Sequence, residues 1–187
     1  MSELDRRLVH ASGAVVPGAF LAGVVPWAAV EWFLVAASVL AAVLEVLRLY
    51  GHVSWRVYDR LTRDYEQENV AGYALYTFSW TVTAWLFDPA IAVPAMLMLA
   101  LGDPASGLLS GSGGLGVKPG WVLLATFGIC LAIAGLLDVP LVPAVAGALA
   151  ATLADGATPV VRGYVIDDNA TIPLGAGVAM WAVLALL

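Results

Sequence analysis

The sequence predicts an all-α integral membrane bundle of about seven transmembrane helices, plus one interfacial amphipathic helix. Of its 187 residues, 61% are hydrophobic and only 12% are charged, whereas ordinary soluble domains carry about 25% charged residues. So few charges do not cover the surface of a soluble domain of this size. The apolar runs also follow one another closely, so residues 1–187 are predicted to form a single transmembrane domain.

Seven stretches approach the roughly 20 mainly apolar residues that a spanning helix needs. They are Val9–Trp27, Ala28–Leu47, Val70–Phe87, Pro89–Leu101, Trp121–Leu137, Val139–Ala154 and Thr171–Leu187. The fourth stretch is short and contains Pro94, which predicts a broken or half helix whose end is buried among other helices.

The charges predict the orientation. With a cytoplasmic N-terminus, the long connections at 51–69, 102–120 and 155–170 face the cytoplasm, while the outer connections are short. All eight Lys and Arg residues then lie on the cytoplasmic side or at that membrane boundary, as the positive-inside rule requires. We therefore expect an integral membrane protein whose N-terminus and active face are cytoplasmic.

The connection at 51–69 has helical periodicity of its own. Trp55, Tyr58 and Tyr65 recur at helical spacing, with arginines elsewhere around the helix. This pattern predicts an amphipathic helix in the headgroup region. It serves either as a surface anchor or as a gate for a lipid substrate.

Two function classes are disfavoured by composition. The net charge of −6 argues against a nucleic-acid partner, which would require a basic surface. A catalytic or metal-binding thiol is also disfavoured. The single cysteine, Cys130, lies in an apolar run and is interpreted as a small buried hydrophobic residue.

Polar pairs occur at the predicted cytoplasmic ends of the first two spans. Arg6 and His10 are one helical turn apart and therefore share a face. Anchoring explains the arginines of this segment, but not the histidine. Glu45 and Arg48 are spaced for an i,i+3 ion pair.

The connection at 102–120 has the residues of a phosphate-binding loop. Asp103 follows an apolar run, where a carboxylate is costly unless it is paired or bound to a metal. Glycines allow backbone N–H groups to approach an anion closely, and Lys118 supplies a positive charge. The candidate phosphate-binding glycines are Gly102, Gly111, Gly114 and Gly116.

The connection at 155–170 is acidic. Asp155 is followed later by Asp167, Asp168 and Asn169, and carboxylates with an amide are natural oxygen ligands for Mg²⁺. The alternative is an N-cap, in which Asp or Asn satisfies free N–H groups at the start of a helix. Together, the acids, the glycines and Lys118 predict a Mg²⁺–nucleotide site that transfers a phosphoryl group to a membrane lipid.

In their order along the chain, these residues resemble the dolichol kinase, phytol kinase and CTP-dependent diacylglycerol kinase family. The matching segments are Arg6-Arg7-Leu8-Val9-His10, Glu68 (or Glu66) followed by Gly72-Tyr73, Gly102-Asp103-Pro104-Ala105-Ser106, and Asp167-Asp168-Asn169-Ala170-Thr171-Ile172-Pro173-Leu174. The last is the most specific match. The chain departs from the family after the glycine-rich loop, where Lys118-Pro119-Gly120 is not followed by Glu, and at Asp155, where members carry Glu.

The resemblance implies a kinase that uses CTP and Mg²⁺ to phosphorylate a polyisoprenoid or related lipid alcohol. It implies that Asp103, Asp167 and Asp168 bind metal or align the hydroxyl group. Lys118 and the glycine loop would hold the CTP phosphates, together with Asn169, while Arg6 and His10 would contact phosphate or product. Two other functions remain open: a CTP:lipid-phosphate cytidylyltransferase, such as a CDP-archaeol or CDP-diacylglycerol synthase, and a small membrane transporter with Asp103 on its ion path.

Overall fold

Helices form nearly all of the structure, which is a computed structural model describing residues 3–51, 66–67, 69–111, 116–157, 159–161 and 164–187. The helices are α1 (Glu3–Ser12), α2 (Val15–Leu21), α3 (Trp27–Leu49), α5 (Gly72–Leu86), α6 (Pro89–Leu97), the π-helical turn η2 (Met98–Gly102), α7 (Asp103–Ser110), α8 (Gly120–Leu136), α9 (Leu141–Gly156) and α10 (Asp168–Leu186). The two-residue strands β1 (Val160–Val161) and β2 (Tyr164–Val165) pair antiparallel between α9 and α10. The predicted all-α class is confirmed.

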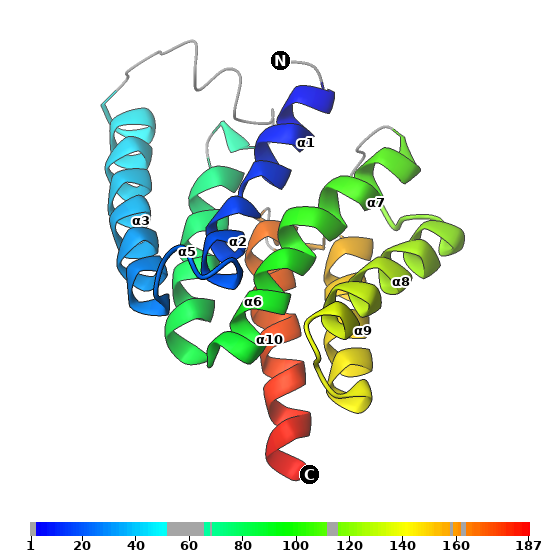
Figure 1. Cartoon of the computed structure of the whole chain (residues 1–187). Coiled ribbons are helices and arrows are strands. Elements are labelled where there is room, and N and C mark those ends of the chain that lie inside the picture. Colours follow the sequence, from blue (N-terminus) through cyan, green and yellow to red (C-terminus); the bar gives the residue numbers. More distant parts are fainter. Residues whose placement is uncertain (1–2, 52–65, 68, 112–115, 158, 162–163) are drawn as a thin grey trace.

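The helices alternate in direction, so that one end of the bundle collects most of the candidate site residues (Figure 1). The beginnings of α1, α5 and α10 lie at this end, together with the final turns of α3, α7 and α9. The C-terminus of the chain lies at the opposite end. Residues 102–110, the end of α9 and the start of α10 are therefore brought to the same region of the fold.

Three helices are long and apolar enough to cross a membrane, as judged by length and composition. They are Trp27–Leu49, Pro89–Ser110 and Asp168–Leu186, while the apolar helices Gly120–Leu136 and Leu141–Gly156 are shorter. A bundle of seven spans is thus not confirmed. The predicted first span is divided into α1 and α2, because Pro17 has no N–H and its ring clashes with the carbonyl four residues earlier, at Gly13.

The fourth predicted span was expected to be short, but it continues into a helical segment of 22 residues, Pro89–Ser110. Pro94 lies inside α6, and η2 joins α6 directly to α7. This segment runs through the core, where Met96, Met98 and Leu99 are fully buried. As a result Asp103 lies within a helix, and the connection predicted at 102–120 narrows to residues 111–119.

The exposed and buried side chains are distributed differently from those of a soluble protein. Large apolar side chains such as Trp32 and Phe33 are more than half exposed, whereas Glu45, Asp155 and Asp168 are buried. Soluble monomers rarely expose contiguous apolar surface beyond a few hundred Å². The apolar helices and this surface are compatible with a membrane protein. Most of the amphipathic helix predicted at 51–69 lies outside the described residues.

Candidate metal centre and adjoining cleft

Three acidic side chains from distant parts of the chain meet near one end of the bundle. Asp103 begins α7, Asp155 lies in the last turn of α9, and Asp168 begins α10. One carboxylate oxygen from each lies within 4.8 Å of the other two. Asp155 and Asp168 are only 2% and 5% exposed. Because like charges repel and burial penalises ionised groups, such a cluster requires cationic partners.

Lys118 is one such partner. Its Nζ atom lies 2.7 Å from Asp155 Oδ1 and donates a second hydrogen bond, 2.9 Å long, to Ser106 Oγ. Ser106 in turn donates to Asp155 Oδ2 over 2.6 Å. Asp155 needs this support because it lies at the negative end of its helix dipole, whereas Asp168 lies at the favourable N-terminal end of α10.

Ser106 was not among the predicted site residues, although its spacing from Asp103 could have identified it. It follows Asp103 by three positions in α7, so the two side chains project from neighbouring positions of one helix face. Ser106 is completely buried, and its hydroxyl links Lys118 to Asp155. It therefore acts as a positioning residue for the acid cluster.

The structure differs from the predicted metal set of Asp103, Asp167 and Asp168. Asp167 caps α10: its Oδ1 accepts hydrogen bonds from the backbone N and the side-chain Nδ2 of Asn169, at 2.9 and 2.6 Å. The N-cap role considered for this segment thus belongs to Asp167. Asp155, which was a secondary candidate, takes the third place in the cluster.

The N-terminal helix adds basic groups beside the acids. His10 Nδ1 lies 3.6 Å from Asp103 Oδ2, and the imidazole packs edge-on against Tyr76 with ring centroids 4.8 Å apart. Arg6 lines the adjoining cleft. The guanidinium of Arg7 instead donates to the Gly111 carbonyl, 3.1 Å away, and so joins α1 to the end of α7.

The predicted glycines have different surroundings. Gly102 is buried in η2, where an added Cβ would lie 3.2 Å from Cys130 Sγ, so its role is close packing. Gly111 follows α7 with a φ of +80°, a conformation that favours glycine. Gly116 is exposed, two residues before Lys118. Gly114 and Glu68 lie outside the described residues.

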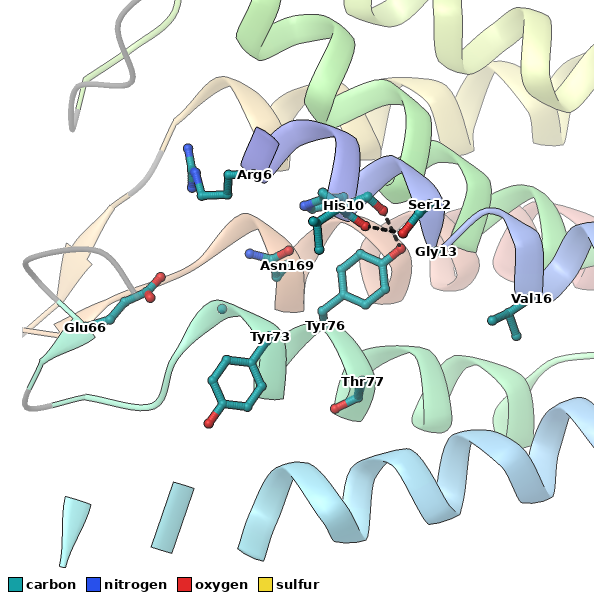
Figure 2. A pocket seen from close by; sticks show the side chains of 12 residues that line it. Arg6, His10, Ser12, Gly13, Val16, Glu66, Tyr73, Tyr76, Thr77 and Asn169 are labelled. Atoms are coloured by element: carbon teal, nitrogen blue, oxygen red, sulfur yellow. Dashed lines mark hydrogen bonds between the residues drawn. The ribbon is translucent and has the colours of Figure 1, made fainter. Parts of the chain in front are cut away.

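A cleft of about 390 Å³ adjoins the acids on the side of α1, α2 and α5 (Figure 2). His10 and Asn169 line this cleft. His10 contacts Asp103 of the acid cluster, and Asn169 directly follows Asp168 in the chain. Figure 2 shows Arg6 and Glu66 toward one end of the view and Val16 toward the other, with Tyr76 between. The cleft therefore has a polar end and an apolar end.

The predicted Glu45–Arg48 ion pair is confirmed and has a wider structural role. Arg48 Nη2 lies 2.7 Å from Glu45 Oε2, and Arg48 also donates to the backbone carbonyls of Glu66 and Asn69. Glu45 further accepts from Tyr73 and from the Ala71 backbone N–H. These bonds anchor residues 66–71 to the end of α3, and this segment carries Glu66 to the cleft.

The acid cluster has the donor set of a divalent-cation site. Carboxylate oxygens suit Mg²⁺, which is usually held by one or two carboxylates together with waters or substrate phosphates. Comparisons with protein-family models, curated proteins and solved structures found no match for this chain.

Proposed function

We propose that this chain is an integral membrane lipid kinase that uses CTP and Mg²⁺ to phosphorylate the hydroxyl group of a polyisoprenoid or related lipid alcohol. One observation carries the proposal: Asp103, Asp155 and Asp168 converge within 4.8 Å beside an amphipathic cleft. A site of this kind can hold a metal–phosphate group next to a bound lipid. The choice of CTP and of a lipid alcohol comes from the family resemblance.

The residues divide into three roles in this proposal. Asp103, Asp155 and Asp168 hold the metal ion, which when bound neutralises charge on the transferring phosphoryl group. Lys118 and Ser106 keep the Asp155 carboxylate in place through hydrogen bonds of 2.9 Å or less. His10 lies between Asp103 and the cleft, where it would orient the acceptor hydroxyl toward the phosphate.

The membrane setting follows from the surface and from the charges. Exposed apolar side chains on the long helices would provide a surface for lipid, and the distribution of Lys and Arg residues supports an orientation with the N-terminus and the acid cluster on the cytoplasmic side. Cytosolic CTP would then approach from water, while the lipid alcohol would approach from within the bilayer.

The direct test supplies purified full-length chain with Mg²⁺, CTP or ATP labelled at the γ-phosphate, and a panel of lipid alcohols and lipid phosphates. We expect label to enter a lipid alcohol with release of CDP. A parallel reaction uses cytidine-labelled CTP. Cytidine-labelled lipid with release of pyrophosphate would instead identify a cytidylyltransferase and reject the kinase.

A second prediction concerns Lys118 and does not depend on turnover. Three carboxylates and one ammonium leave two net negative charges in the cluster. In Lys118→Met the buried Asp155 loses its cation, so we expect a loss of about 3 kcal/mol of stability in EDTA, equivalent to a fall in Tm of about 6–12 °C. Mg²⁺ should restore more stability to this variant than it adds to the original chain, because the cluster has become more negative.

Thermal unfolding in detergent, with and without Mg²⁺, measures this effect. Lys118→Arg, which keeps the positive charge, is the matched control and should respond to Mg²⁺ as the original chain does. An equal Mg²⁺ response in Lys118→Met and the original chain would contradict a divalent-cation site at the cluster.

A further inference from the structure

The cleft beside the acid cluster combines two chemical characters in one cavity. Its walls come from α1, α2 and α5. Arg6, Glu66 and Asn169 lie toward the polar end and Val16 toward the apolar end, with Thr77 near Tyr76 between them (Figure 2). A ligand that fills it therefore needs a polar head and an apolar body.

The polar end adjoins the proposed reaction centre. His10 belongs to the cleft, and its Nδ1 atom lies 3.6 Å from Asp103 Oδ2. Asn169 also lines the cleft and directly follows Asp168 in the chain. The head of a ligand in this cavity would thus lie close to Asp103, whose carboxylate is within 4.8 Å of the other two.

The middle of the cleft is lined by Tyr76, whose ring is fixed by aromatic packing. Tyr76 is held between the edge-on contact with His10 and a tilted contact with Trp80, whose ring centroid is 4.5 Å away. Gly13 faces the Tyr76 hydroxyl so closely that an added Cβ would overlap it. Because the ring is held on both sides, the cleft has little room to widen at this point.

The size of the cavity limits what it holds. Its volume of about 390 Å³ is near the lower end of the roughly 300–1,000 Å³ typical of small-molecule sites. This space suits a head group and the first part of one chain rather than the glycerol backbone and two acyl chains of a diacylglycerol. Val9 lines the cleft and is 54% exposed, so the cleft is open to the surface beside α1.

We propose that this cleft is the acceptor-lipid site and that it selects a single-chain lipid alcohol, with the hydroxyl at the His10–Asn169 end and the chain passing Gly13 and Val16. The inference rests on the proposed kinase function and adds the place and class of the acceptor. Because its volume is about 390 Å³, we expect the cleft to disfavour diacylglycerol-type acceptors, which carry a second acyl chain.

The test is photo-crosslinking of the full-length chain in lipid nanodiscs. The probe is a long single-chain alcohol carrying a diazirine a few carbons from the hydroxyl, and labelled peptides are located by mass spectrometry. We expect label in α1–α2 and α5, with competition by unlabelled single-chain alcohol and none by diacylglycerol. Label scattered over the outer apolar surface, or equal competition by diacylglycerol, would overturn the proposal.

Two bulky substitutions provide a matched pair. Val16→Trp fills the apolar end of the cleft and leaves less room for the lipid chain, so we expect labelling to fall about tenfold, equivalent to about 1.4 kcal/mol of binding. Val15→Trp adds the same bulk at a side chain that is 71% exposed and outside the cleft lining, and should leave labelling unchanged. Equal labelling of the two variants would reject the site.

Folding and turnover are controlled separately. Val16→Ala adds no bulk and should retain cleft labelling, while size-exclusion chromatography confirms that Val16→Trp remains monodisperse. Labelling needs no CTP, so cleft labelling without any lipid phosphorylation would reject the kinase and keep the lipid site. Phosphorylation of lipid with labelling elsewhere would reject the lipid site alone.

Discussion

Asp168→Asn is expected to reduce CTP-dependent lipid phosphorylation by at least about 100-fold, since even outer-shell changes at metal sites cost about 10–100-fold. The substitution keeps the shape of the side chain but removes one of the three negative charges of the cluster. Asn remains acceptable at a helix N-terminus, so α10 should still form. Initial rates across a Mg²⁺ titration measure the effect, with an increased Mg²⁺ requirement expected.

Asp167→Asn is the matched control, one residue away in the chain. Asp167 accepts two hydrogen bonds from Asn169 as the N-cap of α10, and Asn caps helices about as well as Asp. We therefore expect nearly unchanged rates and an unchanged Mg²⁺ requirement. Equal losses in the two variants would support the adjacent pair predicted from sequence, whereas unchanged rates in Asp168→Asn would reject the cluster as the reaction centre.

The helices could be predicted from the sequence because long apolar runs allow few other structures. Their interruptions were harder to predict. Pro17 divides the first predicted span, while Pro94 is accommodated within α6. Proline disrupts a helix through its own geometry, but whether the chain continues past it depends on packing. The fully buried Met96 and Met98 indicate how firmly the later segment is held in the core.

The site could be predicted in part. Asp103 was singled out because a carboxylate at the end of an apolar run needs a partner, and Asp168 because carboxylates with an amide are natural Mg²⁺ ligands. The structure groups Asp155 with these two acids, whereas the sequence pattern suggested Asp167, because Asp167 and Asp168 are adjacent in the chain although their side chains have different surroundings. Asp167 adopts extended backbone geometry and turns back onto α10, whereas Asp155 reaches the cluster from the end of another helix. The packing of α9 against α10 determines which acid joins the cluster. The periodicity of a single segment carries no information about such packing.

Arg48→Met is the substitution expected to cost the most stability. Both side chains of the Glu45–Arg48 pair are less than a tenth exposed, and removal of one partner from a buried ion pair typically costs about 3–5 kcal/mol. Arg48 also donates to the carbonyls of Glu66, Gln67 and Asn69, which would lose a charged donor. Thermal unfolding in detergent should show a fall in Tm of about 6–20 °C.

Arg48→Lys separates charge from geometry at this position. Lysine keeps the positive charge but lacks the planar fork that reaches Glu45 and three backbone carbonyls together, so we expect a stability between those of the original chain and Arg48→Met. The loss of stability should also disturb the cleft, since these carbonyls belong to the segment that carries Glu66. This part of the cleft is tightly packed: an added Cβ on Gly72 would lie within 3.3 Å of both the Glu66 carboxylate and the Asn169 amide. A lysine variant as stable as the original chain would show that charge alone holds α3 to this segment, whereas a stable methionine variant would show that the ion pair is not needed.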